Sequence, residues 1–247
     1  MKLNQTLSLI ILFVITTLLS CQKDEIKTDP IINIQFDHKV GNANLEFDTI
    51  MYTNSSNNNY SIYTLQYFLS DFEFTKTDGT KILFDTIVYI DAKEEIGLVL
   101  AGLILPIGEY SKLDLTFGLD DEKNINGLFV NPPETNMEWP VPMGGGYHYM
   151  KLEGKFDSAS IVKNYQAHTG RLMTTPHFID INLEFTNSLN LSSGAEITLS
   201  LVMDINNWWE SPNNLNLNIM SSVMGNETIQ NDLMENGVDA FYIDKIR

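Results

Sequence analysis

Cysteine is almost absent from this 247-residue chain, which contains only Cys21. An apolar run from Leu7 to Leu19 precedes it, and the small residue Ser20 lies directly before it. This order is typical of a bacterial lipoprotein signal, whose cleavage leaves the cysteine as the lipidated first residue. No thiol would then remain for a disulfide or a metal ion. A plain secretory signal with an incidental cysteine is the alternative interpretation.

A membrane-spanning segment is also lacking, because the apolar run is too short and charged residues follow it closely. We therefore predict a lipoprotein signal peptide at residues 1–20, a polar lipid-anchored tether at 21–30 and one folded domain at 31–247. Acidic residues soon after Cys21 favour the cell envelope of a Gram-negative bacterium, with the anchor in its outer membrane. The membrane is thus an expected partner through the lipid.

Basic residues are few. Without residues 1–20, which contain the single charge of Lys2, the chain would carry 14 basic and 32 acidic residues, a formal net charge of −18. Such a surface repels phosphate groups, so nucleic acid is not an expected partner. The acidic residues are spread along the chain, which favours an ordinary solvated surface over a dedicated site for cations.

Helical periodicity is scarce, and alternation of apolar and polar residues is common. The alternation predicts strands near residues 32–36, 67–74, 82–90, 113–117, 177–185 and 197–205. A helix is expected at residues 226–236, with Asn226 as its cap, and a brief one near 206–209. The predicted fold is an all-β antiparallel sandwich of Greek-key type, with one or two short helices near the C-terminus.

Familiar catalytic motifs are missing. The sequence has no nucleophile elbow, no phosphate-binding glycine loop and no zinc-protease helix motif. No acid–base pair can be singled out among 32 carboxylates. We therefore expect a protein that is not an enzyme.

Histidine is the scarce residue with metal chemistry, with four copies. His38 ends the first strand and is expected at the surface, while His177 opens an apolar strand face and is expected at the core edge. His148 is expected on the same strand face as Met150. His168 lies between a polar stretch and a turn, and such loop positions often carry function.

The segment Met137–Gly154 contains unusual chemistry, because it combines Trp139, three methionines and His148. Imidazole and thioether groups suit copper, especially Cu(I). Met137, Met143, His148 and His168 could supply such a set. An ordinary aromatic loop leading into a sheet is the alternative, since methionine is also common core filler.

Two further patterns have competing interpretations. The segment Leu119–Gly127 is rich in oxygen donors and could bind calcium, but Ile125 stands where an EF-hand needs glycine, which favours a solvated acidic loop. Trp208 and Trp209 could form a platform for a glycan. Adjacent strand residues point to opposite faces, so core packing of one and edge packing of the other is favoured.

A series of short motifs resembles the MbnP-like family, the methanobactin-partner and copper-repressible surface proteins. The motif Gly146–Gly154 is the strongest, and the order and spacing of the whole series add specificity. The landmarks are Tyr67–Phe72, Leu105–Tyr110, Phe117–Leu119, Asn131–Pro132, Met137–Trp139, Gly146–Gly154, His168–Gly170, Asp204–Asn206 and Asn236–Phe241.

The resemblance implies an exported β-sandwich-like domain that binds copper through two histidines and a tryptophan oxidised to kynurenine. It also implies a di-haem peroxidase-like partner that performs the oxidation. By position, Trp139 would be the oxidised residue and His168 one ligand. Relatives can place a histidine two residues after the tryptophan, where this chain has Val141, and His148 is the nearest substitute.

Two functions remain in competition. The first is a non-enzymatic copper-binding lipoprotein, with His148 and His168 as ligands assisted by Trp139 and by Met137 or Met143. The second is a metal-free surface module that binds a glycan or protein partner through Trp208 or Trp209 and aromatic loops.

Overall fold

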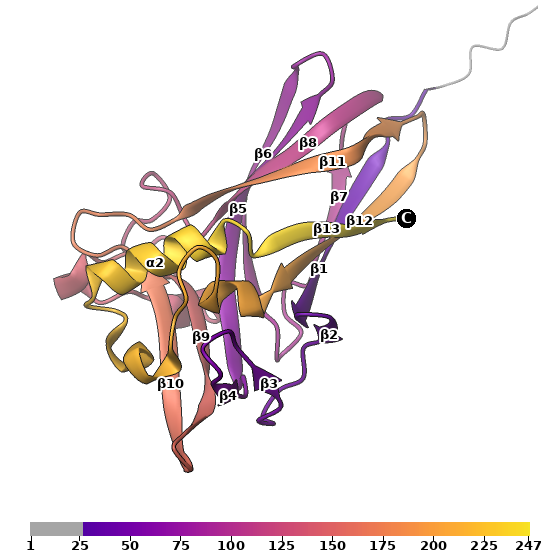
Figure 1. Ribbon diagram of the computed structural model, residues 1–247. Helices are drawn as coiled ribbons and strands as arrows, with labels where there is room; N and C mark the ends of the chain where they lie inside the picture. Colours follow the sequence, from indigo (N-terminus) through magenta and orange to yellow (C-terminus); the bar gives the residue numbers. More distant parts are fainter. Residues whose placement is uncertain (1–26) are drawn as a thin grey trace, which may run out of the picture.

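The computed structural model describes residues 27–247 (Figure 1). The predicted signal peptide and Cys21 lie outside the described residues. The first strand begins at Ile31, which is also where the sequence places the start of the folded domain. Within residues 27–247, no helix is long and apolar enough to cross a membrane.

The smaller sheet contains both ends of the domain. Its central strand β1 pairs in parallel with β12 and antiparallel with β7 and β2, and β12 pairs antiparallel with β13. Thr28 donates its backbone N–H to Ser193, and Arg247 exchanges backbone hydrogen bonds with Thr198. The strands are β1 (Ile31–Val40), β2 (Ala43–Asn44), β7 (Val99–Ile104), β12 (Glu196–Asp204) and β13 (Phe241–Ile246).

The larger sheet is organised around β5 (Thr64–Lys76), which pairs with three strands. One edge of β5 pairs with β6, and the other edge pairs with β9 up to Tyr67 and with β8 from Leu69 onward. The register shifts next to Asp71, which has a positive φ of 58°. The other strands are β3 (Tyr52–Thr53), β4 (Asn59–Tyr60), β6 (Lys81–Asp91), β8 (Gly108–Phe117), β9 (His148–Ser158), β10 (Ile161–Gly170) and β11 (Ile179–Leu191).

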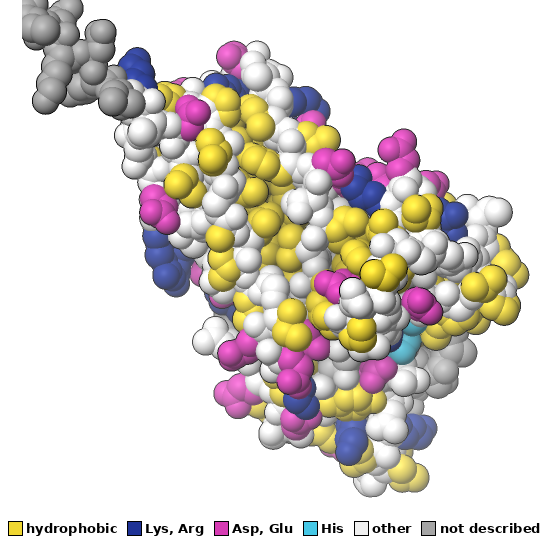
Figure 2. Space-filling view, turned by 180° about the vertical axis from the view of Figure 1, so that it is seen from behind, with side chains coloured by type: hydrophobic (Ala, Val, Ile, Leu, Met, Phe, Trp, Pro, Cys, Tyr) yellow, Lys and Arg dark blue, Asp and Glu magenta, His cyan; other side chains and the backbone are white. Residues whose placement is uncertain are grey.

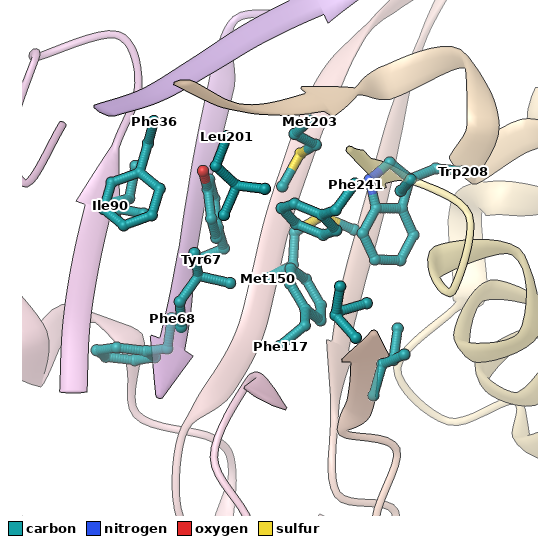
Figure 3. Close-up of a cluster of buried hydrophobic side chains, with 14 of the residues drawn as sticks. Phe36, Tyr67, Phe68, Ile90, Phe117, Met150, Leu201, Met203, Trp208 and Phe241 are labelled. Atoms are coloured by element: carbon teal, nitrogen blue, oxygen red, sulfur yellow. The ribbon is translucent and has the colours of Figure 1, made fainter. Parts of the chain in front are cut away.

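The core lies between the two sheets (Figure 3). Phe36, Leu201 and Phe241 come from the smaller sheet, and Tyr67 and Phe117 come from the larger one. The rings of Phe117 and Phe241 have centroids 5.7 Å apart, which joins the two layers directly. The predicted all-β sandwich is therefore confirmed, although the parallel pairing of β1 with β12 was not part of the prediction.

Short helical segments close the sandwich on one side. The predicted C-terminal helix is confirmed as α2 (Glu227–Gly237), where the Asn226 side chain accepts a hydrogen bond from the backbone N–H of Ile229. The predicted brief helix is a 3-10 turn, η3 (Ile205–Trp209). The other turns are η1 (Glu134–Met137), η2 (Val141–Met143) and η4 (Leu217–Ser222).

Charged side chains are dispersed over the surface. On the face drawn in Figure 2, aspartate and glutamate side chains alternate with lysine, arginine and apolar groups and do not gather into one acidic patch. This distribution agrees with the interpretation of the acidic residues as an ordinary solvated surface.

Gly154 offers a test of the packing between β9 and the loop before β5. A Cβ atom added there would lie 1.8 Å from the Ser61 carbonyl oxygen and 2.6 Å from the Tyr165 ring. A backbone oxygen atom cannot move aside without shifting the chain. Gly154→Ala should therefore lower the free energy of unfolding by at least about 2 kcal/mol. Urea denaturation measures this, with Gly225→Ala as the control, since its added Cβ would meet only Met143 Cε at 3.7 Å. Equal stability of the two variants would contradict the packing.

Candidate metal centre

The hairpin of β9 and β10 brings two of the predicted ligands together. His148 begins β9, and His168 lies near the end of β10. Their imidazole rings have centroids 5.0 Å apart and are nearly perpendicular, at 83°. His168 therefore lies on a strand and not in the loop that the sequence suggested, and strand pairing fixes its position.

A β-bulge turns His148 toward His168. Met150 pairs with Thr169 and His148 pairs with Gly170, so Tyr149 is the extra residue on β9. His168 pairs with Lys151 and shares its face, whereas Met150 packs in the core. The expectation that His148 shares a face with Met150 is therefore wrong, because the bulge breaks the alternation of the strand.

Each imidazole has one nitrogen held by a hydrogen bond. Nδ1 of His148 lies 2.9 Å from the Met137 carbonyl oxygen, and Nε2 of His168 lies 2.6 Å from Glu153 Oε1. A carbonyl can only accept, so Nδ1 of His148 carries the proton. Nε2 of His148 is then a lone-pair donor, and it is buried without a partner among the described residues. In the same way, Glu153 leaves Nδ1 of His168 for another partner.

Burial keeps His148 neutral. The side chain is only 6% exposed, and this desolvation lowers its pKa to about 3, with a smaller contribution from the positive charge of Lys151. The hydrogen bond from His168 lowers the pKa of Glu153 from its usual value. The centre therefore presents a neutral imidazole and an ionised carboxylate near neutral pH, which are the forms that support metal binding.

Trp139 packs against the same pair of histidines. Its ring centroid is 4.7 Å from that of His148, at an interplanar angle of 77°. The indole also lies against Gly170, where an added Cβ would be 2.7 Å from it. The indole is 2% exposed, while the side chain of Val141 is 71% exposed and points away. Trp139, His148 and His168 thus form one contiguous cluster.

The two methionines of the predicted ligand set have different positions. The Met137 side chain is fully buried in the hydrophobic core, and its carbonyl group contacts His148. Met143 is partly exposed, and its carbonyl oxygen accepts a bond of 3.4 Å from the Trp139 indole N–H. The structure brings the three rings of the set together, with the Met137 side chain buried in the core and the Met143 side chain partly exposed.

The oxygen-rich segment Leu119–Gly127 forms hydrogen bonds with the glycine loop of the centre, Gly144–Gly146, and with the residue after it. Asn124 Oδ1 accepts the backbone N–H of Tyr147 at 2.8 Å, and Asn126 Oδ1 accepts that of Gly146 at 2.6 Å. The ammonium group of Lys123 lies 2.7 Å from Asp71 and 3.7 Å from Asp120. These oxygens are already used by protein donors, which does not favour the calcium interpretation.

A cavity of about 570 Å³ lies beside His168. It is formed by the end of β10, the last residue of η2, the loop before α2 and the start of α2. Its lining includes Met143, His168, Met224, Asn226 and Glu227. The ring cluster therefore has a hollow next to one of its imidazoles.

Three supporting residues were not identified from the sequence. Glu153 orients His168, and Gly170 gives the indole room. Gln230 on α2 is fully buried and donates its amide to the His168 carbonyl oxygen at 2.8 Å, while its own oxygen accepts the Gly170 N–H at 3.3 Å. Glu153 and Gly170 lie in the family motifs Gly146–Gly154 and His168–Gly170. Gln230 is a polar residue on a short helix, and no sequence pattern indicates its role.

The remaining candidates lie elsewhere. Trp208 and Trp209 are both fully buried, so the glycan platform is wrong, because the 3-10 turn η3 directs both indoles inward. His177 is buried as expected, with Nδ1 3.1 Å from the Gly170 carbonyl oxygen. His38 is not a free surface residue, since its Nε2 lies 2.9 Å from the Tyr67 hydroxyl oxygen.

The neutrality of His148 predicts a specific pH dependence. A histidine in the unfolded chain has a pKa near 6.5, whereas in the fold the pKa of His148 is lowered to about 3. Between these two pH values the unfolded state therefore binds more protons than the folded state. The contribution of His148 to the free energy of unfolding should be constant above pH 6.5 and should fall as the pH is lowered toward 3. The loss should be at most about 1.4 kcal/mol per pH unit.

Unfolding of the metal-free protein at several pH values measures this effect. His148→Gln should make the profile less steep between pH 6 and 4, while His38, whose pKa burial lowers to about 4, still contributes. The ring resonances of His148 should also show no titration between pH 5 and 8 by NMR. A midpoint in that range would contradict the burial argument.

Comparison with known proteins agrees with the motif series. The sequence pattern of the MbnP family matches residues 29–227, which include every residue of the ring cluster. A search of curated proteins gives no match. Among solved structures, MbnP from Methylosinus trichosporium aligns with a TM-score of 0.49 and 11% identity, over 69% of this chain and 75% of that one. On the strength of the family match, which covers most of its length, this chain belongs to the MbnP family.

Proposed function

We propose that this protein binds one copper ion between His148 and His168, next to Trp139, as a non-enzymatic protein of copper acquisition or homeostasis. The observation that carries this proposal is the buried Nε2 atom of His148, which has no partner among the described residues. An unpaired buried acceptor costs free energy, and a metal ion would satisfy it.

The surrounding hydrogen bonds support the same proposal. Ligating histidines usually donate their second ring N–H to a carbonyl or carboxylate, which fixes the tautomer and orientation of the ring. Met137 and Glu153 occupy these positions for His148 and His168. The free nitrogens would hold the copper ion, and Trp139 would cover one side of it.

The donor set also favours copper over harder ions. Within residues 27–247, no group of three or more histidine, cysteine, aspartate or glutamate side chains is arranged to hold a metal. Structural zinc sites use four such ligands and calcium uses six to eight oxygens. Two imidazoles beside an aromatic ring suit copper better.

The location and the state of Trp139 are further parts of the proposal. The protein would be attached to the outer membrane of a Gram-negative bacterium through lipids on Cys21. A di-haem peroxidase-like partner would oxidise Trp139 to kynurenine, which removes one carbon and adds one oxygen. Because Trp139 packs against His148, such a change would lie beside the proposed copper ion.

Copper titration of the purified lipoprotein tests the site. Wild type should bind one ion, and His148→Ala or His168→Ala should weaken binding by at least about tenfold, because loss of a supporting hydrogen bond alone has an effect of that size. Glu153→Gln should weaken it less. His38→Gln, a histidine of the other sheet, is the matched control. Unchanged affinity in both alanine variants would exclude the site and favour a metal-free binding module.

Mass spectrometry of protein isolated from its native host tests the modification and the anchor. The peptide containing Trp139 should be heavier by one oxygen minus one carbon, and Trp139→Phe should abolish the difference. Acyl chains should be attached at Cys21, and Cys21→Ser should release the protein from the membrane fraction. An unmodified Trp139 peptide from cells that express the partner would refute the oxidation.

A further inference from the structure

Two methionines from distant segments of the chain line the cavity beside His168. Met143 ends the turn η2, and Met224 lies in the loop between η4 and α2. Both line the cavity, and both are partly exposed, unlike the core residues Met137 and Met150. The methyl end of Met143 lies 3.7 Å from the position of a Cβ on Gly225, the neighbour of Met224. The two methionines thus line the same cavity.

His168 connects this opening with the ring cluster. It lines the cavity and also contacts His148, whose ring centroid is 5.0 Å away. His148 and Trp139 are buried and are not among the residues that line the cavity. Among the described residues, His168 is therefore the member of the ring cluster that borders the cavity.

The acidic surface of the protein favours cations near the cavity. Glu227 lines the cavity in the first turn of α2, where its carboxylate offsets the partial positive charge of the helix start. The whole chain has a formal net charge of −17, which raises the local concentration of cations at the surface. Thioethers select soft ions such as Cu(I) from this population, because hard cations prefer oxygen ligands.

We infer that Met143 and Met224 form an entry site for Cu(I) at the cavity opening, from which the ion passes to His168 and His148. This inference rests on the proposed copper centre and adds a route to it. The thioethers bind the ion on arrival, and the two imidazoles hold it afterwards. Met143 is then an entry residue and not a ligand of the final centre.

Loading kinetics of the mature lipoprotein test the route. Cu(I) is supplied as its bicinchoninate complex, and the loss of the complex's colour is followed by stopped flow. The double variant Met143→Leu/Met224→Leu, which conserves side-chain volume, should load about tenfold more slowly. Its equilibrium dissociation constant should change by less than about twofold. Met51→Leu, a methionine that is 48% exposed and outside the cavity, is the control.

Loading of the double variant at the wild-type rate would overturn the entry site, and so would a large loss of its equilibrium affinity, since the thioethers would then be ligands of the final centre. These outcomes are distinct from failure of the proposed function, in which His148→Ala and His168→Ala leave equilibrium affinity unchanged.

A second measurement does not depend on the buried centre. In the His148→Ala variant with ¹³C-methyl methionine, added Ag(I), a soft analogue of Cu(I), should shift the methyl resonances of Met143 and Met224. The Met51 methyl resonance should not move. Unshifted Met143 and Met224 resonances would overturn the inference even if copper binds elsewhere.

Discussion

The structure depends on the way β5 shares one of its edges between two strands. β9 uses this edge up to Tyr67 and β8 uses it from Leu69, and the register is broken beside Asp71. Because β8 and β9 follow each other along one edge, the chain between them must leave the sheet and return. That connection contains the oxygen-rich segment, Trp139 and the glycine loop. The candidate metal centre is therefore a product of the branch in the larger sheet.

Within this arrangement, the neutral and the charged groups of the candidate centre occupy different positions. The ring cluster is buried, and its imidazole at position 148 stays uncharged because desolvation dominates its pKa. The charged groups lie outside the ring cluster. Glu153 contacts His168, and Glu227 lines the cavity. A buried carboxylate without a cation would be costly, so this order lets the metal-free protein fold without a large electrostatic penalty. The candidate metal centre can thus exist as a preformed site.

Sequence patterns could predict the sandwich because alternating residues such as Ile32, Ile34 and Phe36 must bury one face of a strand. The motif series also indicated Trp139, His148 and His168, which the structure places in contact. Alternation failed at His148, because a bulge inserts a residue and reverses the face. It failed at Trp208 and Trp209 because a 3-10 turn does not follow the period of a strand. Gln230 could not be found, since its partners lie about sixty residues away.

Both ends of the described domain join the smaller sheet, which has a consequence for how this domain could be rebuilt. Thr28 bonds beside Ser193 and Arg247 beside Thr198, so a short linker could connect the ends. New ends could be opened at Ala159 and Ser160, the exposed turn between β9 and β10, where circular permutation is best tolerated. In such a permutant His148 and His168 would belong to opposite ends of the polypeptide. Their meeting would then depend on the inter-strand ladder alone, without a covalent turn to hold them in register.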